Sequence, residues 1–406
     1  MRLVPLLAIV AILLSLARIA AQAQLETIYE FAGPPDGSAP QGLAEGPNGV
    51  LYGMTAYGGS FGYGTVFQLT PPATPGRPWT ETILLEFSNP YSDGTGTNPF
   101  SSPVVGKDGF IYGATGVIST IFQLQPPAAP GGAWTETVLY PPDEDYPAGG
   151  FNHGLIGGPN GELYAAASVG GYYRCGAVVG LTPPPVSGPW SVSIEYDFPG
   201  GNSGCQPAGI ALSADGVIYG VTTYGGTSGQ GIVFALTPSP IPYQYTETVL
   251  YNFTGAADGG LPSQPPILAP VPEAAFAIYG TTASGGSGGL GGVFELLWDL
   301  GSGTWVESLP FSFAWGYPGI PSSALLESNG DFYGVTANGY ANSDPGGTIF
   351  QLSPNGPLLL ETVLHKFEGP AGPSGNLIMS KSGVLYGTTV SGPGPAGYGT
   401  VYRIKP

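Results

Sequence analysis

Charged side chains are scarce in this sequence, and basic ones are the scarcest. Lysine and arginine together number 9 against 27 aspartates and glutamates, which gives a formal net charge of −18. Charged residues make up 9% of the 406 residues, against roughly 25% in an average soluble domain. Because so acidic a chain repels phosphate groups, the composition argues against nucleic acid and anionic lipid as partners.

Histidine and cysteine are rarer still, with 2 residues of each. A Ser-His-Asp or Cys-His centre needs a histidine poised as general base, and we interpret His153 and His365 as loop and strand residues instead. Two cysteines and two distant histidines are too few soft ligands for zinc. No dinucleotide, phosphate-loop or EF-hand motif is present. The sequence therefore predicts no catalytic residue, no metal and no cofactor.

The N-terminal residues have the features of an export signal. Arg2 supplies a positive charge, residues 3–16 form an apolar run, and Ala21-Gln-Ala23 is a small-residue cleavage site. The apolar run is shorter than the ~20 residues that span a bilayer. We expect residues 1–23 to be removed, which leaves a charge of 7 − 27 = −20. This predicts a secreted or cell-surface protein without a transmembrane segment.

What the sequence has in abundance is an internal repeat. A tyrosine in a Leu-Tyr-Gly-like motif occurs seven times, at intervals of 60, 52, 55, 60, 54 and 53 residues by subtraction. A fixed period near fifty residues with several strands per unit is typical of a β-propeller. The seven positions are Tyr52, Tyr112, Tyr164, Tyr219, Tyr279, Tyr333 and Tyr386.

Each unit is predicted to hold four strands, A to D, with A innermost. In the first unit these are residues 41–45, 50–55, 65–70 and 81–87, where polar and apolar residues alternate. An Asn-Gly or Asp-Gly dipeptide between A and B favours a type I′ hairpin. The dipeptides are Asn48-Gly49, Asp108-Gly109, Asn160-Gly161, Asp215-Gly216 and Asn329-Gly330.

The order of the strands predicts how the ring closes. The chain begins on a D-type strand at residues 26–31 and ends on a C-type strand at 400–404, so the seventh unit lacks its own D. Closure by the N-terminal strand would remove the exposed sheet edges that template aggregation. We therefore predict that residues 24–406 form a single all-β domain, a seven-bladed β-propeller whose N-terminal strand completes the last blade.

The outermost strand of each unit carries a recurring glutamate. We interpret this repeated charge as a device that discourages edge pairing between molecules. The residues concerned are Glu26, Glu81, Glu136, Glu247 and Glu361.

The two cysteines occupy loops of neighbouring units. Cys175 lies between strands B and C of the third unit, and Cys205 lies in the D–A connection that enters the fourth. In an up-and-down blade, B–C and D–A connections emerge on the same face. We therefore predict a disulfide between Cys175 and Cys205, as an exported chain permits.

The B–C loops are rich in aromatic residues, which form our candidate binding face. Flat aromatic rings with hydroxyl tips suit sugars or protein partners, although packing between blades is the alternative explanation. The residues are Tyr57, Phe61, Tyr63, Tyr172, Tyr173, Tyr224, Tyr340 and Tyr398.

Acidic residues on the same face are the candidates for hydrolase chemistry, which needs only paired carboxylates. They are Asp36, Asp93, Asp258 and Asp344, and the first three lie in related Asp-Gly turns, for which a structural role is the simpler explanation.

The motif Leu-Tyr-Gly-x-Thr, followed by Gly-Gly and then Gly-Thr-Val-Phe-x-Leu, resembles the repeat of the bacterial "GloVer" (Gloeobacter/Verrucomicrobia-type) tandem-repeat proteins. The resemblance covers residues 25–406 and is clearest at 51–69, 218–236 and 385–404. The third unit departs from the motif with Ala165 for glycine and Val179 for phenylalanine. Membership implies export, a propeller fold and no assigned activity, so no catalytic residue can be transferred.

Three functional hypotheses remain at this point. The first is a secreted binding or interaction module for glycans, extracellular proteins or other cell-envelope partners. The second is a carbohydrate-active hydrolase or lyase that uses acids on the loop face, and the third is a purely structural surface protein. Paired carboxylates of raised pKa in a cleft would favour the enzyme, and an exposed aromatic patch without them would favour the binding module.

Overall fold

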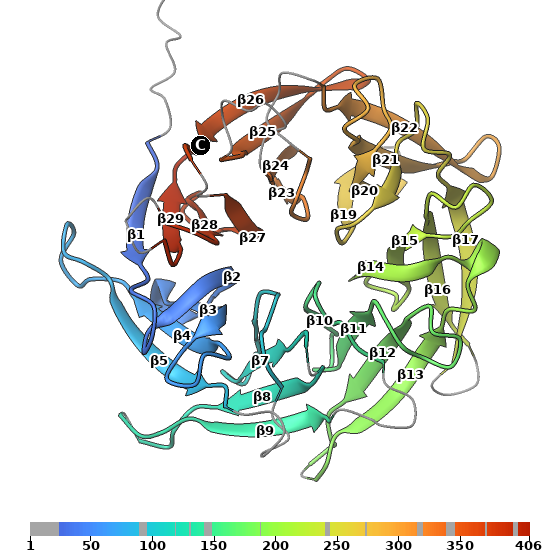
Figure 1. Cartoon of the computed structure of the whole chain (residues 1–406). Coiled ribbons are helices and arrows are strands. Elements are labelled where there is room, and N and C mark those ends of the chain that lie inside the picture. The colour runs from blue at the N-terminus through green and yellow to red at the C-terminus, as the bar shows by residue number, and fades with distance from the viewer. Residues whose placement is uncertain are drawn as a thin grey trace, which may run out of the picture.

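The chain forms a ring of seven antiparallel β-sheets, which the computed structural model in Figure 1 shows arranged as the blades of a propeller. The structure describes residues 24–88, 96–117, 119–129, 131–141, 148–186, 188–239, 244–272, 274–314, 320–337, 346–369, 372–392 and 397–406. No α-helix occurs in these ranges. The predicted all-β, seven-bladed fold is confirmed.

The first four blades each consist of four consecutive strands. Blade 1 contains β2 (Gly37–Glu45), β3 (Leu51–Gly58), β4 (Thr65–Thr70) and β5 (Thr80–Glu86). Blade 2 contains β6 (Val104–Val105), β7 (Ile111–Ala114), β8 (Ile121–Gln125) and β9 (Thr135–Tyr140). Blade 3 contains β10 (Leu155–Gly157), β11 (Leu163–Ala167), β12 (Ala177–Thr182) and β13 (Ser191–Asp197). Blade 4 contains β14 (Cys205–Leu212), β15 (Ile218–Tyr224), β16 (Ile232–Pro238) and β17 (Tyr245–Asn252).

The last three blades include one split strand and one strand from the other end of the chain. Blade 5 contains β18 (Gly260–Pro262) and β19 (Ile267–Val271), which both pair with β20 (Ala274–Ser284), then β21 (Gly292–Asp299) and β22 (Thr304–Ser312). Blade 6 contains β23 (Leu326–Ser328), β24 (Asp331–Thr336), β25 (Thr348–Asn355) and β26 (Leu358–Lys366). Blade 7 contains β27 (Pro373–Met379), β28 (Leu385–Thr389), β29 (Thr400–Ile404) and β1 (Glu26–Glu30).

The N-terminal strand closes the ring, as predicted. Strand β1 pairs antiparallel with β29, so that Glu26 lies opposite Arg403. The Arg403 Nη2 and Glu26 Oε2 atoms are 2.7 Å apart. Directly after β1, the buried ring of Phe31 packs edge-on against Phe67 of blade 1, with the ring centroids 5.1 Å apart.

In five of the seven Leu-Tyr-Gly-like motifs, the glycine makes room for a phenylalanine of the adjacent strand, and in blade 7 Gly387 makes room for Tyr402. A Cβ atom added to Gly53 would lie 2.2 Å from Phe67 Cζ. The same close approach recurs between Gly113 and Phe122, Gly220 and Phe234, Gly280 and Phe294, and Gly334 and Phe350.

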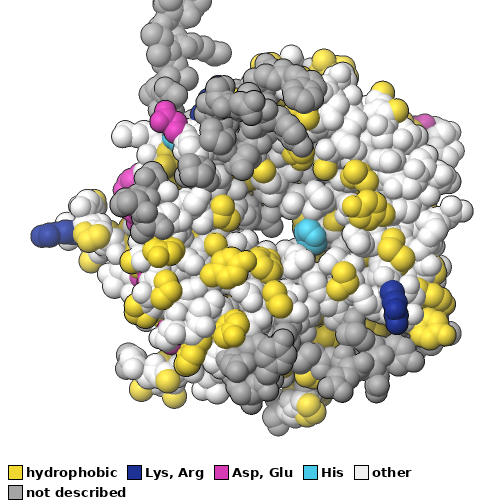
Figure 2. Space-filling view, viewed as in Figure 1, with side chains coloured by type: hydrophobic (Ala, Val, Ile, Leu, Met, Phe, Trp, Pro, Cys, Tyr) yellow, Lys and Arg dark blue, Asp and Glu magenta, His cyan; other side chains and the backbone are white. Residues whose placement is uncertain are grey.

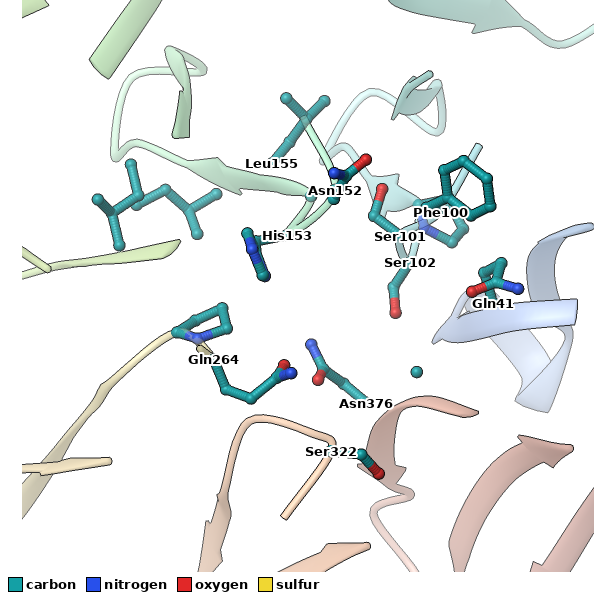
Figure 3. A pocket seen from close by; sticks show the side chains of 16 residues that line it. Gln41, Phe100, Ser101, Ser102, Asn152, His153, Leu155, Gln264, Ser322 and Asn376 are labelled. Carbon is teal, nitrogen blue, oxygen red and sulfur yellow. The ribbon is translucent and has the colours of Figure 1, made fainter. Parts of the chain in front are cut away.

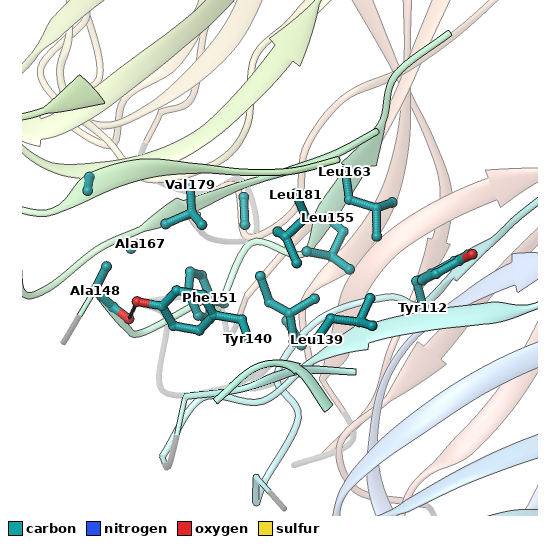
Figure 4. Packing of buried hydrophobic residues seen from close by; sticks show 14 residues of the cluster. Tyr112, Leu139, Tyr140, Ala148, Phe151, Leu155, Leu163, Ala167, Val179 and Leu181 are labelled. Atoms are coloured by element: carbon teal, nitrogen blue, oxygen red, sulfur yellow. Dashed lines mark hydrogen bonds between the residues drawn. The ribbon is translucent and has the colours of Figure 1, made fainter. Parts of the chain in front are cut away.

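Blade 3 replaces both members of this pair at once. Ala165 lies opposite Val179 in the β11–β12 register. Valine is smaller than the phenylalanine of the other blades, so it leaves room for the Ala165 methyl group that replaces the glycine hydrogen. Figure 4 shows the buried cluster that contains Val179. In the same cluster, Phe151 packs edge-on against Tyr140, with the ring centroids 5.5 Å apart. The third unit's departure from the motif is therefore a compensated exchange within one core.

Tryptophans that precede or begin strand D link blades 1, 2, 3 and 5 to the blade before each of them. Each packs edge-on against the motif tyrosine of the preceding blade, with ring centroids 5.7–6.3 Å apart. The pairs are Trp79 with Tyr386, Trp134 with Tyr52, Trp190 with Tyr112, and Trp305 with Tyr219.

The A–B turns agree with the type I′ prediction only in part. Both central residues have positive φ in Asn48-Gly49 (61° and 73°) and in Asn329-Gly330 (56° and 85°), as a type I′ turn requires. In the Asp108, Asn160 and Asp215 turns only the glycine has positive φ, so the prediction is wrong there. At Asp108 the carboxylate accepts a hydrogen bond from the Phe110 N–H, which stabilises a different turn.

Within the described ranges, no helix is long and apolar enough to cross a membrane. The signal segment predicted for residues 1–23 lies outside the described residues, so its removal stays a prediction.

Candidate functional site

The B–C and D–A connections share one face of the ring, which we call the loop face. At four seams a backbone N–H of the D–A connection donates to a carbonyl in the B–C loop of the preceding blade, at 2.8–3.0 Å. Each donor has a φ of 52–58° and is followed by proline. The pairs are Ala39 with Tyr398, Asn98 with Tyr63, Gln206 with Cys175, and Leu261 with Gln230.

The proline that follows each donor packs against a glycine of the neighbouring loop. A Cβ atom on Gly176 would lie 2.5 Å from Pro207 Cδ, and one on Gly399 would lie 2.5 Å from Pro40 Cδ. At these four seams the contacts attach the B–C loop of one blade to the first inner residues of the next blade.

The predicted disulfide is present on this face. Cys175 and Cys205 are bonded, with their Cα atoms 4.5 Å apart. The bond joins the B–C loop of blade 3 to the first residue of β14 in blade 4. A disulfide is compatible with an extracellular protein.

The aromatic residues of the candidate binding face have different environments. Tyr172 and Tyr173 are 67% and 54% exposed, and their rings meet edge-on with centroids 5.0 Å apart. Tyr63 is half-buried and packs against the core between blades 1 and 2. Tyr398 lies against the backbone at Gly33, where a Cβ atom would come within 2.4 Å of the ring.

The remaining members are distributed around the ring. Tyr57 and Phe61 are exposed in blade 1, and Tyr224 is exposed in blade 4. Tyr340 lies outside the residues that the structure describes. The structure therefore brings one aromatic pair into ring contact, Tyr172 with Tyr173. It places Tyr57, Phe61 and Tyr63 at one loop of blade 1, and Tyr224 and Tyr398 at the loops of blades 4 and 7.

The centre of the ring holds a cavity of about 280 Å³, which we call the channel. All seven blades contribute to its wall, and Figure 3 shows His153, Gln264 and Asn376 pointing toward one another across it. Figure 2 shows one face of the ring, with few charged side chains and a histidine exposed near the centre. The polar side chains of the wall are Gln41, Ser101, Ser102, Asn152, His153, Gln264, Ser322 and Asn376.

His153 is the one channel residue whose side chain titrates. His153 is half-buried among the channel walls, and this burial lowers the pKa of its imidazole. His153 of blade 3 and Gln41 of blade 1 both line the channel.

The aspartates proposed for hydrolase chemistry hold their own loops together. Asp36 accepts hydrogen bonds from the Ala32 N–H at 2.8 Å and from the Tyr29 hydroxyl at 3.1 Å. Asp258 accepts the equivalent bonds from the Thr254 N–H at 2.8 Å and the Tyr251 hydroxyl at 3.0 Å. Asp93 and Asp344 lie outside the described residues.

Glu81, on an outer strand, lies in the seam between two blades, which corrects its interpretation as an exposed edge charge. Glu81 is half-buried, and burial, followed by the nearby charge of Asp36, raises the pKa of its carboxyl to about 7. Glu307 repeats this arrangement beside Asp258, again with a pKa of about 7. Burial also raises the pKa of Glu247 and Glu361.

This geometry predicts a pH dependence of stability. Because the folded-state pKa values of Glu81 and Glu307 exceed those of the unfolded chain, the folded protein binds more protons between pH 4.5 and 7. Stability should therefore fall as the pH rises through that window. We expect E81Q/E307Q to raise the Tm at pH 8 by on the order of 2 °C, since partial exposure screens the effect, and to change it little at pH 5.

Thermal unfolding of both proteins at several pH values measures this difference. Comparing variant with parent cancels the opposite contribution of His153, whose lowered pKa reduces stability as the pH falls below 6.5. An E81Q/E307Q effect that is equal at pH 5 and pH 8 would contradict the assignment.

Comparison with known sequence families assigns the chain to one of them. Residues 151–316 and 277–406 match the Gloeobacter/Verrucomicrobia repeat, and together they span more than half of the chain. The chain belongs to the Gloeobacter/Verrucomicrobia repeat family. No curated protein sequence matches it.

Solved structures similar to this Gloeobacter/Verrucomicrobia repeat protein share its fold at low identity. Virginiamycin B lyase from Staphylococcus aureus, a catalytically inactive variant solved with quinupristin, is 13% identical, with a TM-score of 0.56 over 95% of this chain and 99% of that one. A chain of the mitotic checkpoint complex is 11% identical, with a TM-score of 0.50 over 94% and 91%. Because a lyase and a chain of the mitotic checkpoint complex share this fold, the fold alone does not identify the function of this chain.

Sequence reasoning missed most of the channel wall. Among the described residues, no group of three His, Cys, Asp or Glu side chains is arranged to hold a metal ion, and the conspicuous polar cluster is uncharged. One sequence feature is shared by three of these residues: Gln41, Gln264 and Ser322 each follow a proline by one or two residues, namely Pro40, Pro262 and Pro321.

Proposed function

We propose that this Gloeobacter/Verrucomicrobia repeat protein is an extracellular binding module that recognises carbohydrate through its loop face. The observation that carries the proposal is the exposed Tyr172–Tyr173 pair, two rings held edge-on at the surface. Aromatic rings with polar tips stack on the C–H faces of sugars while their hydroxyls form hydrogen bonds.

The contacts around this pair support a binding role because they order the loop in the absence of ligand. The Tyr172 N–H donates to Asp197 Oδ2 at 2.7 Å, and Cys175, two residues beyond Tyr173, is bonded to the next blade. A loop ordered in advance loses little conformational entropy on binding. Tyrosine adds to this advantage because it has only two side-chain torsions to fix.

The position of the carboxylates favours a binding module over a hydrolase. The carboxyls whose pKa is raised to about 7, on Glu81 and Glu307, lie in seams on the outer strands. None of the residues that line the channel carries a carboxylate. A glycosidase needs two carboxyl groups that flank one bond in a cleft, and the described residues provide no such pair at the channel.

A glycan array tests this proposal. We expect retained binding to one sugar class, and a loss of affinity of about tenfold or more in Y172A and Y173A, since aromatic anchors contribute most to such sites. W298A is the matched control, because Trp298 is an exposed aromatic residue on a C–D hairpin rather than on the loop face. Silence across the array, or equal losses in all three variants, would refute the proposal.

A further inference from the structure

The channel wall combines hydrogen-bonding groups without charge. Its sixteen lining residues include four amides, three serines and one histidine, and none is Asp, Glu, Lys or Arg. Phe100, Leu155 and Ile210 supply apolar surface between the polar groups. A wall of this kind suits a neutral ligand with both hydroxyl groups and C–H faces, because an unpaired charge would lose its hydration without compensation.

Several polar atoms of the wall lack a partner among the described residues. The Ser101 side chain is only 5% exposed, and its hydroxyl makes no hydrogen bond in the described part of the chain. The buried hydroxyls of Ser102 and Ser322 are likewise without a partner there. Leaving a buried hydroxyl unsatisfied is costly, and these three serines line the cavity, so a bound molecule or water that reached their hydroxyls would supply the missing partner.

The amide groups present specific atoms to such an occupant. The side-chain oxygen of Asn376 accepts the Ala324 N–H at 3.0 Å, which leaves the NH₂ group as the donor. The Gln41 NH₂ group donates to the Ala39 carbonyl at 3.0 Å, which leaves its side-chain oxygen as an acceptor. Donors and acceptors therefore face the channel from different blades, as recognition of a hydroxyl-rich ring requires.

The size of the channel limits the occupant. Pockets that bury drug-sized ligands measure roughly 300–1,000 Å³, and this cavity measures about 280 Å³. A single sugar ring fits this volume better than an oligosaccharide does. The wall is also close-packed, since a Cβ atom on Gly42 would lie 2.2 Å from Ser102 Oγ.

We propose that the channel is a binding site for a neutral, polyhydroxylated ring compound, either a free monosaccharide or the terminal unit of a glycan. This inference deepens the proposed function, since it adds a deep subsite at the centre of the face that carries Tyr172 and Tyr173. A chain end seated in the channel directs the remaining sugar units outward across the loop face.

The test uses the purified protein and a panel of ring compounds. The neutral members are D-glucose, D-galactose, D-mannose, D-xylose, L-arabinose and myo-inositol, and the charged ones are glucuronate and glucosamine. Saturation-transfer NMR identifies binders, and calorimetry gives their Kd, which we expect on the order of 1 mM for at least one neutral compound. The charged analogue of that compound should bind at least about tenfold more weakly.

Two variants that fill the channel from different blades locate the site. S102L and S322L should each weaken binding by at least about tenfold, because leucine occupies the volume that the ring needs. S191L is the matched control, since Ser191 is exposed on the outer strand β13. Far-ultraviolet circular dichroism and the Tm show whether each variant is folded, and two independent variants allow for the failure of one.

The outcomes separate this inference from the proposed function. If no neutral compound binds, or if binding survives both channel variants, the inference is overturned and ordered water is the occupant of the channel. If glycan binding depends on Tyr172 but not on Ser102 or Ser322, the proposed function is supported and the channel site is refuted. If a monosaccharide binds in the channel while Y172A and Y173A leave glycan binding unchanged, the channel site stands and the aromatic site fails.

Discussion

Replacement of Phe31 by alanine is expected to lower the free energy of unfolding by about 3–5 kcal/mol, the usual cost of truncating a buried phenylalanine. Phe31 is 1% exposed and packs edge-on against Tyr29 of the closing strand and against Phe67 of blade 1. The substitution therefore removes the contact by which the N-terminal strand joins the first blade. For a chain of this length the Tm should fall by roughly 5 °C.

Differential scanning calorimetry of F31A measures this loss, with T27A as the control on the same strand. Thr27 is exposed, so its truncation should change the Tm by less than about 1 °C. F31A should also be more prone to aggregation, since a loosened β1 uncovers the edge of β29. Equal stability of F31A and T27A would show that the ring does not depend on its N-terminal strand.

Loss of the disulfide is the second large effect. Cys175 and Cys205 are 30 residues apart, and the loop-entropy estimate for a bridge of that span is about 3–4 kcal/mol. We expect C175S/C205S to unfold several degrees below the parent under oxidising conditions. A reducing agent should lower the Tm of the parent and leave that of C175S/C205S unchanged.

The disulfide also has a functional consequence. Because it fixes the loop that carries Tyr172 and Tyr173, C175S/C205S should bind glycans more weakly even at temperatures where it is fully folded. Full glycan affinity in the folded C175S/C205S variant would mean that the loop is held by its other contacts alone, including the Tyr172–Asp197 hydrogen bond. A Tm that is the same for parent and variant would contradict the stabilising role.

The ring and its closure could be predicted from the sequence because both follow from strand order. Each unit repeats the same four strands, and only the last lacks its D strand, so the strand that begins at Glu26 has one place to pair. The pairing of Cys175 with Cys205 followed from the same reasoning, since adjacent blades bring a B–C loop beside a D–A connection. In the ring, the local sequence pattern and the strand topology therefore favour the same structure.

The channel could not be predicted because its residues meet only through closure of the whole ring. Gln41, Gln264 and Asn376 come from blades 1, 5 and 7, and no sequence spacing relates them to a common point. The environment of Glu81 could not be predicted from the sequence either. Its position on an outer strand suggests exposure, and only the packing of one blade against the next places it beside Asp36 and raises its pKa.

A crystal structure of the protein with the tightest-binding glycan from the array would locate the bound ligand. We expect density for a neutral terminal ring in the channel, within hydrogen-bonding distance of Ser101 or Asn376, and for further units on the loop face near Tyr172 and Tyr173. Ligand density confined to the opposite face, where the A–B turns and C–D hairpins lie, would contradict this expectation.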